Sequence, residues 1–342
     1  MSAGIIPVRY GIVGCGIIAE VHASEIAKLP EAELVAVCDV NLDQAARFAA
    51  QYGAAAYSNL DELLARPDIE VVSICTPSGL HEEQVIRAAR AGKHILVEKP
   101  MAIQMEGVER MIEACEQENV LLATVFPRRM SPQAQYAKQL IASGALGKLS
   151  LCSAYVKIYR SQAYYDSAGW RGTWAMDGGG AMMNQGIHTV DMLQWLAGPV
   201  ASLEGRARNV LRDIEVEDTV TSLLQYESGA MGVLEITTTA YKGKGQRLEL
   251  YGETGTLIIE EDDIVMLELD GAEVTLPEFA PFAVIPDGHR EQLRDLAYAV
   301  REGRTPVIPG TEGRHSLEII LGTYASSRLK QEIKLKEHFS MV

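Results

Sequence analysis

Residues 8–19, VRYGIVGCGIIA, join a short apolar run to a glycine-rich turn and the start of a helical pattern. The small residues of the turn follow the spacing GxGxxA, with glycines at 14 and 16 and alanine at 19. Glycine lets the backbone approach a pyrophosphate, which then rests on the N-terminus of the following helix. The context strengthens the motif, because it follows the first predicted strand and Asp39 ends the second. We therefore expect a dinucleotide-binding turn here.

Asp39 predicts the choice of cofactor. A carboxylate at this place accepts hydrogen bonds from both ribose hydroxyls of NAD and repels a 2′-phosphate. Val40 and Asn41 follow it and supply no positive charge for such a phosphate. The sequence thus predicts NAD rather than NADP. The cofactor-binding residues expected from this part of the chain are Gly14, Gly16, Ile17, Ile18 and Asp39.

Short β-branched runs alternate with helical patterns up to about residue 125. A strand-helix-strand rhythm implies right-handed crossovers and a parallel sheet covered on both faces. We predict a Rossmann domain of the doubly wound type over residues 1–125. The expected strands are 8–13, 34–38, 71–75, 94–97 and 120–124, and the expected helices are 19–28, 42–51, 81–91 and 106–118.

The pattern changes from Leu149 onward, where strand-like segments follow one another with short turns between them. Such a succession is typical of an antiparallel meander. We predict an α+β domain over residues 126–342 with a large, mostly antiparallel open sheet, for substrate binding and oligomerisation. Its expected strands are 201–211, 219–226, 229–238, 247–251, 255–260 and 264–269, and its expected helices are 181–196, 290–302 and 311–334.

Length and composition agree with two globular domains. The chain has 342 residues, 47% hydrophobic and 23% charged, which is enough to bury large cores. Its formal net charge of −15 argues against nucleic acid, since phosphate-backbone binding needs a basic face. No charge-free apolar stretch is long enough to span a bilayer, and the start lacks the pattern of a signal peptide. We expect a cytoplasmic protein without a membrane partner.

The five cysteines are scattered singly, at positions 15, 38, 75, 115 and 152. Neither disulfide nor zinc spacing appears, and no metal site is predicted. A lone cysteine inside an apolar run is usually a small buried residue, and we expect that here.

Two further motifs follow predicted strands. Residues 75–81 read CTPSGLH and residues 98–100 read EKP. Both lie where the carboxyl ends of parallel strands are expected, which is where open α/β sheets bind their ligands. Taken alone, His81 suits a helix N-terminus and Lys99 a solvated loop. The proline after Lys99 can hold the loop in a cis or otherwise fixed turn that aims the lysine inward.

The motifs GxGxxA, CTPSGLH and EKP, in this order and spacing, resemble the glucose–fructose oxidoreductase/inositol dehydrogenase/MocA family. The resemblance continues through 127–132 (PRRMSP), 170–172 (WRG), 178–180 (GGG) and 186–191 (GIHTVD), so it covers most of the chain. It implies an NAD(P)-dependent enzyme that acts on sugars, amino sugars, nucleotide sugars or cyclitols. It also implies a Rossmann domain followed by an open-sheet domain that often mediates oligomerisation.

The resemblance implies roles for individual residues. Lys99 would reach the reacting hydroxyl and the nicotinamide ribose, and Lys99 and His188 would be the catalytic residues. The cofactor would be lined by Thr76, Pro77, Ser78, His81, Glu98, Lys99, Arg128, Trp170 and Arg171. The substrate would be bound by Lys99, Arg160, Tyr165, Arg171, Asn184 and His188.

The segment around His188 also has a logic of its own. Asn184, His188 and Asp191 are spaced four and three apart, so a helix places them on one face, where Asp191 can orient the imidazole. Many relatives carry an aspartate where this chain has Asn184. An amide orients a hydroxyl but does not accept its proton, which leaves Lys99 or His188 as the base. The NQGIH variant is similar to members that oxidise C3 of sugars or UDP-sugars.

We therefore expect an NAD-dependent dehydrogenase that oxidises a secondary hydroxyl of a sugar or nucleotide sugar, with C3 as one candidate position. The alternatives are an inositol or cyclitol dehydrogenase, a glycosidase that uses bound NAD transiently, and a non-catalytic NAD-binding sensor. A sensor needs neither Lys99 nor His188. The partners expected are a small-molecule sugar or cyclitol and further copies of the chain, as a homodimer or homotetramer.

Overall fold

The computed structural model describes residues 6–340 and divides into two compact units. The first unit contains the chain up to Ala102, Glu106–Pro127 and Ala283–Gly313, and the second contains Ile103–Met105, Arg128–Phe282 and the chain from Arg314 onward. The division expected between residues 125 and 126 differs in one large respect, because 283–313 returns to the first unit. Helical periodicity shows that a segment has an apolar face, but it does not show which sheet that face covers.

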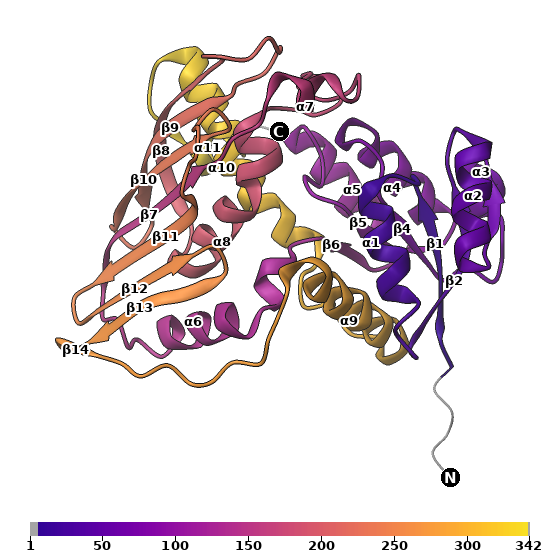
Figure 1. Ribbon diagram of the computed structural model, residues 1–342, viewed down its shortest axis with the longest axis horizontal. Coiled ribbons are helices and arrows are strands. Elements are labelled where there is room, and N and C mark those ends of the chain that lie inside the picture. The colour runs from indigo at the N-terminus through magenta and orange to yellow at the C-terminus, as the bar shows by residue number, and fades with distance from the viewer. Residues whose placement is uncertain (1–5, 341–342) are drawn as a thin grey trace. The chain divides into compact units, whose positions relative to one another are not determined.

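The first unit is built on six parallel strands in the order β3-β2-β1-β4-β5-β6 (Figure 1). This confirms the predicted doubly wound sheet. The order reverses between β1 and β4, and ligands of such sheets bind at this switch point, beyond the carboxyl ends of the strands. The strands are β1 (Val8–Val13), β2 (Ala32–Cys38), β3 (Ala55–Tyr57), β4 (Val71–Ile74), β5 (His94–Val97) and β6 (Leu122–Thr124).

Three helices share one buried cluster with the first sheet: α1 (Ile17–Ile26), α2 (Leu42–Tyr52) and α9 (His289–Glu302). The hydroxyl of Tyr10 on β1 donates to the backbone oxygen of Leu293 on α9 at 2.8 Å, which ties the distant segment to the sheet. The remaining helical elements of this unit are α3 (Leu60–Leu64), η1 (Ser78–Leu80), α4 (His81–Arg90), α5 (Met105–Gln117) and the irregular turn η4 (Val284–Gly288), while η2 (Pro127–Met130) follows β6.

The second unit contains a nine-stranded sheet in the order β14-β13-β12-β11-β7-β10-β9-β8-β15. Among its described pairs only β7 and β10 run parallel, which confirms the mostly antiparallel sheet. The strands are β7 (Leu149–Lys157), β8 (Val200–Arg208), β9 (Thr219–Tyr226), β10 (Met231–Thr237), β11 (Gly245–Gly252), β12 (Gly255–Glu260), β13 (Asp263–Leu269), β14 (Ala272–Glu273) and β15 (Ile333–Lys334).

The helices of the second unit gather on one face of this sheet, as Figure 1 shows. They are α6 (Pro132–Ala142), α7 (Gln162–Asp166), the π-helical turn η3 (Ala181–Gly186), α8 (Ile187–Ala197), α10 (Gly310–Leu329) and α11 (Leu335–Phe339). The helix expected over 311–334 is wrong at its end. Lys330 takes a left-handed conformation with φ 59°, which stops α10, and the chain then adds β15 to the edge of β8.

The five cysteines are buried free thiols, as the sequence predicts. Burial raises the pKa of the Cys115 and Cys152 thiols to about 12, so both are inert at neutral pH. Within residues 6–340 no helix is both long enough and apolar enough to cross a bilayer.

Candidate active site

The glycine-rich turn has the geometry that a dinucleotide requires. Gly14 has φ +88°, and a Cβ there would lie 2.8 Å from the backbone oxygen of Cys75, so no larger residue fits between β1 and β4. A Cβ on Gly16 would meet nothing within 4 Å, so the space before the N-terminus of α1 is open. Ala19 is fully buried against the sheet. The turn therefore leaves room for a pyrophosphate at the helix N-terminus.

Asp39 stands beside this turn at the end of β2. Its Oδ2 accepts a hydrogen bond from the amide of Cys15 at 2.9 Å, and its Oδ1 accepts one from the amide of Asn41 at 2.9 Å. Two backbone donors thus fix the carboxylate next to the glycines, in position to meet the ribose of a bound dinucleotide.

Two large apolar side chains flank the same turn and face solvent. Ile17, a predicted cofactor-binding residue, is 85% exposed, and Val40, which directly follows Asp39, is 96% exposed. Exposed apolar groups at a binding turn offer contact area to a ligand with flat apolar rings. The residues present therefore fit NAD on three counts: backbone room, a fixed carboxylate and an apolar border.

His81 connects the two loops that follow β4 and β5. Its ring is 1% exposed, with Nε2 2.8 Å from the backbone oxygen of Thr76 and Nδ1 2.9 Å from that of Pro100. Burial lowers the pKa of His81, so the ring is neutral and its single N–H serves one carbonyl at a time. The imidazole thereby holds the two loops together, and its predicted contact with cofactor stays a prediction.

The Glu98 carboxylate is the centre of a buried polar network beneath Lys99. Its Oε2 accepts a hydrogen bond from the backbone amide of Lys99 at 3.1 Å. Its Oε1 accepts one from Nε2 of His22 at 3.0 Å and lies 3.6 Å from Nε2 of His289. The peptide bond between Lys99 and Pro100 is cis, one of the two geometries that the sequence allowed.

The network continues below His22. Nδ1 of His22 lies 2.8 Å from Oγ of Ser73 on β4, so the serine hydroxyl donates to the ring while Nε2–H donates to Glu98. Burial lowers the pKa of His22 and keeps the ring neutral. Burial alone would raise the pKa of Glu98, but the hydrogen bond from His22 and the nearby ring of His289 hold it well below its usual range. The carboxylate is therefore ionised in a dry site and anchors the backbone that carries Lys99.

Sequence reasoning missed His22, Ser73 and His289. Their ligating and hydrogen-bonding atoms meet only in the folded unit, where one ligand atom each from His22, Glu98 and His289 lie within 4.8 Å of one another. A signal existed for His22, which is three residues beyond the glycine motif on the inward face of α1. His289 gives no such signal, because it enters the unit from a segment far along the chain.

In the second unit, Asn184 is held by a buried carboxylate. Its Nδ2 donates to Oδ1 of Asp177 at 2.6 Å, and Oδ2 of Asp177 accepts the amide of Gly172 at 2.9 Å. Asp177 is 2% exposed. The sequence analysis did not single it out, although a carboxylate close to Asn184 fixes which way the amide points. The half-buried His188 follows on α8.

The start of this helical segment depends on Glu217. Its two oxygens accept the amides of Gly180 at 2.7 Å and Met182 at 2.9 Å, and the hydroxyl of Tyr324 at 2.8 Å. A Cβ on Gly180 would lie 1.7 Å from the backbone oxygen of Glu217, so the approach requires glycine. Burial raises the pKa of Glu217 to about 7, although the three donors oppose this shift.

Asp191, expected to orient His188, forms a bidentate ion pair with Arg129. Nε and Nη2 of Arg129 donate to the two oxygens of Asp191 at 2.8 and 2.6 Å, and both side chains are buried. This pair fixes α8 to the segment that follows β6. Removal of either partner would leave a buried charge, which typically costs about 3–5 kcal/mol.

The residues between 160 and 171 that were predicted to bind substrate or cofactor differ in their burial. Tyr165 is 4% exposed and its hydroxyl lies 2.8 Å from Oγ1 of Thr238, so it supports the loop from within. Tyr164, which the sequence analysis did not assign, accepts a hydrogen bond from Nη1 of Arg171 at 2.9 Å. Arg171 also stacks on Trp170, with Cζ 4.5 Å from the ring centre.

Arg128 begins the second unit and contacts the turn after β12. Its Nη1 donates to the backbone oxygen of Glu261 at 3.0 Å and lies 3.3 Å from Oδ1 of Asp262. The cofactor contact predicted for Arg128 therefore stays a prediction, as do those for Thr76, Pro77, Ser78 and Trp170.

Comparison with known proteins gives the same assignment for both units. Residues 8–126 match the oxidoreductase family with an NAD-binding Rossmann fold, and residues 134–258 match the GFO/IDH/MocA C-terminal domain. The chain belongs to the GFO/IDH/MocA family. It is accordingly an NAD-binding oxidoreductase, and the predicted family, fold class and cofactor are confirmed.

Two relatives of this GFO/IDH/MocA protein match over nearly its full length, and a third matches over about half of it. The WlbA dehydrogenase of Bordetella pertussis, solved with NADH and UDP-GlcNAcA, is 34% identical, with a TM-score of 0.87 over 96% of this chain and 99% of that chain. The myo-inositol 2-dehydrogenase of Thermotoga maritima is 28% identical over 96% of this chain and 99% of its own. The D-glucoside 3-dehydrogenase of Escherichia coli is 32% identical over 56% of this chain and 54% of its own.

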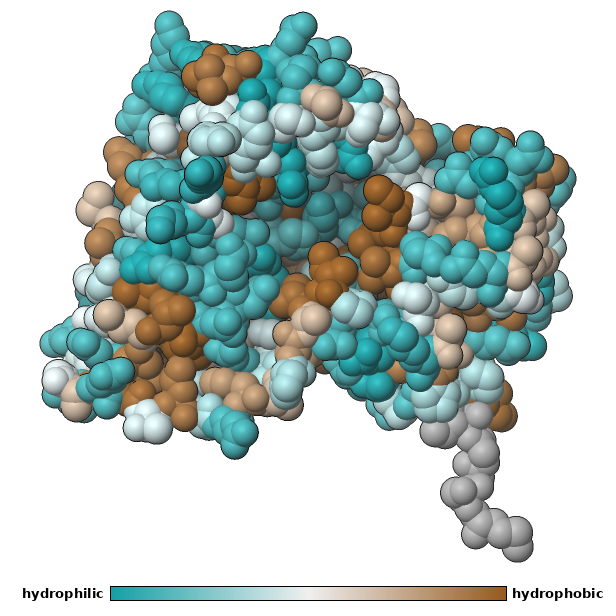
Figure 2. Space-filling model, in the orientation of Figure 1, coloured by the Kyte–Doolittle hydropathy of each residue, from teal (hydrophilic) through white to brown (hydrophobic). Residues whose placement is uncertain are grey.

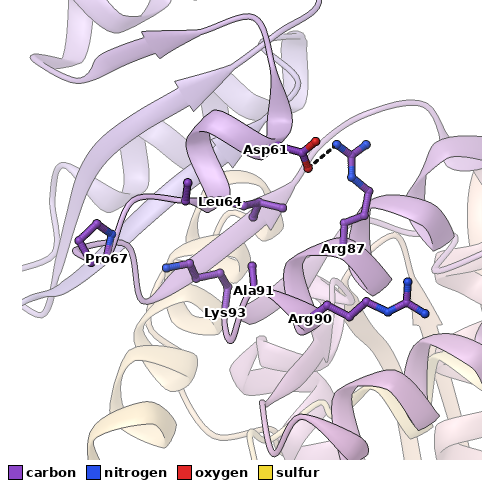
Figure 3. Close-up of a pocket in the computed structure, with 8 residues that line it drawn as sticks. Asp61, Leu64, Pro67, Arg87, Arg90, Ala91 and Lys93 are labelled. Atoms are coloured by element: carbon purple, nitrogen blue, oxygen red, sulfur yellow. Dashed lines mark hydrogen bonds and ion pairs between the residues drawn. The ribbon is translucent and has the colours of Figure 1, made fainter.

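A pocket on the first unit lies apart from the family's motifs. It is lined by Asp61, Leu64, Ala65, Pro67, Arg87, Arg90, Ala91 and Lys93 (Figure 3). Lys93 directly precedes β5, so the pocket is at the amino edge of the sheet, opposite the glycine turn. Arg87 is paired with Asp61 at 2.6 Å, and Nζ of Lys93 donates to the backbone oxygens of Arg66 and Ile69. These cations are already engaged, and we assign the pocket no ligand.

Glu217 predicts how stability depends on pH. Its pKa is raised to about 7 in the folded protein from an ordinary 4.5, so the folded state holds a proton that the unfolded chain has lost. The contribution to stability is therefore greatest below pH 4.5 and falls as pH rises towards 7 and beyond, by up to about 3 kcal/mol. Replacement Glu217→Gln keeps an acceptor without the charge and should remove this part of the pH dependence.

The measurement is the free energy of unfolding in urea at pH 5 and pH 8, for wild type and Glu217→Gln. Glu215→Gln, which changes an exposed carboxylate two residues away, is the matched control and should follow wild type. An equal loss of stability between the two pH values in wild type and Glu217→Gln would contradict the assignment.

Proposed function

We propose that the protein oxidises a secondary hydroxyl on the ring of a sugar or nucleotide sugar, with transfer of the hydride to NAD. The observation that carries this proposal is the anchored Lys99: a buried, ionised Glu98 holds its backbone amide at the carboxyl end of β5. A positioned amine at this edge suits a reaction in which a hydroxyl must lose its proton. A non-catalytic sensor would have no use for such an arrangement.

Relatives support a nucleotide sugar over a cyclitol. The WlbA dehydrogenase complexed with UDP-GlcNAcA is 34% identical, whereas the myo-inositol 2-dehydrogenase is 28% identical over a similar span. The D-glucoside 3-dehydrogenase, 32% identical over part of the chain, supports C3 as the carbon. An inositol dehydrogenase remains the second candidate. A glycosidase with transient use of NAD is distinguished by the absence of net absorbance growth at 340 nm.

Bound NAD supplies an acceptor for the hydride. The chain must supply proton removal, and Lys99 is the residue that contacts the reacting oxygen. The hydroxyl proton goes either to Lys99, from which His188 passes it outward, or directly to His188. Asn184 is not the base, because an amide does not accept a proton at neutral pH. Its Nδ2 donates to Asp177, and we infer that the amide holds the substrate hydroxyl through a hydrogen bond. The predicted cytoplasmic location is part of this proposal.

Cofactor preference tests the role of Asp39. Charge repulsion and lost hydroxyl contacts should favour NAD over NADP by about 100-fold in kcat/KM. In Asp39→Ala the preference for NAD over NADP should become smaller, chiefly because KM for NAD rises. Steady-state rates with both cofactors decide the matter, and a wild-type enzyme that works better with NADP would overturn the prediction.

Substitution of the proposed base tests the chemistry. Lys99→Met and His188→Asn should each lower kcat by at least about 100-fold while NADH still binds, since general base assistance contributes about 10²–10⁴ in rate. Asn184→Ala should mainly raise KM for the sugar. Turnover is followed at 340 nm and cofactor binding by NADH fluorescence. Near wild-type turnover in both Lys99→Met and His188→Asn would show that the mechanism is wrong.

Assembly is also part of the proposal. Helices cover one face of the large sheet, and the other exposes Leu151 (43%), Leu223 (57%) and Met231 (59%) on the neighbouring strands β7, β9 and β10. Apolar side chains also reach the surface towards the β12–β14 end of the sheet (Figure 2). An apolar sheet face of this kind favours contact with a second copy.

We expect a dimer or tetramer of the 37.3 kDa chain in light scattering at micromolar concentration. The double variant Leu223→Glu/Met231→Glu should shift it towards monomer because charges would be buried in the contact. Val307→Glu, at an exposed apolar residue of the first unit, is the matched control. A wild-type protein that scatters as a single 37.3 kDa species would refute the proposed assembly.

A further inference from the structure

The loop around α7 holds arginines stacked on tyrosine rings. The guanidinium carbons of Arg160 and Arg171 lie 5.0 and 4.7 Å from the ring centre of Tyr164. Arg212 joins them from the segment after β8: its Nε donates to the backbone oxygen of Arg160 at 2.7 Å, and its Cζ lies 5.0 Å from the ring of Tyr159. Three arginines from two segments thus gather around the rings of Tyr159 and Tyr164 in the second unit.

These three guanidinium groups have no carboxylate partner. None of them forms an ion pair within residues 6–340, although the chain carries a net charge of −15. Nearby acids bind other groups: Asp166 accepts from the side-chain amide of Gln162 at 3.0 Å, and Glu215 accepts the amide of Trp174 at 3.1 Å. The Asp218 carboxylate accepts the backbone amide of Arg212 at 2.9 Å but forms no ion pair with a guanidinium group of the cluster. The mutual repulsion of these like charges is reduced when an anion from outside binds them.

Two of the donors are also buried without a hydrogen-bond partner. They are Nε of Arg171 and Nη2 of Arg212. An unsatisfied buried donor costs about 1–3 kcal/mol, and more when the group is charged. The rings of Tyr164 and Tyr159 recover only part of this, because a cation–π contact at a partly exposed site contributes about 0.5–1 kcal/mol. The cluster therefore has two guanidinium donors that no protein acceptor satisfies.

We propose that Arg160, Arg171 and Arg212 form a subsite for the diphosphate group of a nucleotide-linked sugar. Planar guanidinium groups bind phosphate oxygens through paired N–H donors, and two or three of them match the charge of a diphosphate. The inference rests on the proposed function, because it takes a nucleotide sugar as the substrate. The subsite nevertheless binds the diphosphate whether or not the sugar is oxidised.

The surroundings favour a nucleotide over an inorganic anion. Tyr241 is 77% exposed and packs edge-on against the half-exposed Tyr159, with ring centres 5.8 Å apart. Lys242 lies over the Tyr241 ring at 5.8 Å and adds a fourth positive charge. An exposed aromatic face beside a diphosphate subsite provides a stacking surface for a nucleobase.

The test is calorimetric titration of the full-length protein with UDP, which lacks the sugar that would be oxidised. Saturating NADH is present, so that the dinucleotide site is filled and does not compete for the diphosphate. We expect wild type to bind UDP, with affinity that falls as salt rises, and to bind uridine undetectably. Arg160→Gln and Arg212→Gln should each weaken UDP binding by about tenfold or more.

Two further variants keep the result interpretable. Arg206→Gln removes an arginine from β8 that already has Glu204 as its partner at 3.2 Å, and it should bind UDP as wild type does. Arg212→Lys keeps the charge but loses the planar fork, so it should fall between wild type and Arg212→Gln. Each variant is checked for an unchanged melting temperature.

The outcomes separate the subsite from the proposed function. Loss of UDP binding in the two glutamine variants supports the subsite even if no sugar reduces NAD, in which case only the proposed function fails. A wild-type protein that does not bind UDP, or glutamine variants that bind it as tightly as wild type, would overturn the subsite. Pyrophosphate binding as tight as that of UDP would remove the nucleobase surface at Tyr241 from the proposal.

Discussion

The buried carboxylate of Glu98 is the constraint on which the first unit's reactive edge depends. An ionised group at 5% exposure is costly unless it is fully hydrogen-bonded, and its partners here come from three separate elements. His22 approaches on α1, His289 on α9, and the amide of Lys99 from the loop after β5. Each partner lowers the cost of the charge, and in return the charge fixes where the Lys99 backbone stands.

This arrangement explains why residues 283–313 leave the second unit to join the first. Helix α9 buries Leu293, Leu296 and Ala297 against the parallel sheet and brings His289 to Glu98 at its N-terminal end. The same helix therefore supplies apolar residues to the core and a polar partner to Glu98. Loss of α9 would expose the apolar face of the sheet and would also remove His289 from the buried Glu98 carboxylate. The two changes together destabilise the unit more than either alone.

The second unit shows the same principle with the opposite electrostatic outcome. Glu217 is also buried and accepts three hydrogen bonds, but two come from backbone amides and one comes from a tyrosine hydroxyl. Burial then prevails, and its pKa rises to about 7 instead of falling. Around α7 the positive charge is in excess instead, because guanidinium groups are gathered there without a carboxylate ion-pair partner. The buried carboxylates of Glu98 and Glu217 are satisfied internally, whereas the arginine cluster has donors without a hydrogen-bond partner.

The sequence by itself determined the local features of this protein: the glycine turn with Asp39, the parallel and antiparallel sheets, the order of most elements, and the short motifs that show the family. Hydrophobic period and turn chemistry are properties of neighbouring residues, so they can be read along the chain. Elements with weak periodicity, such as β3 and α7, escaped this reasoning. The end of α10 also escaped it, because Lys330 adopts a left-handed conformation that its residue type does not announce.

Only the tertiary structure decided which polar groups meet. Asp177 reaches Asn184, Arg129 takes the carboxylate of Asp191, and His289 joins a glutamate 191 residues earlier in the chain. Tyr164 and Tyr165 are adjacent in sequence, yet one lies among the arginines and the other inside the core. A hydrogen bond or ion pair depends on distances of about 3 Å between atoms, and long-range packing sets those distances. No pattern within a single segment contains that information.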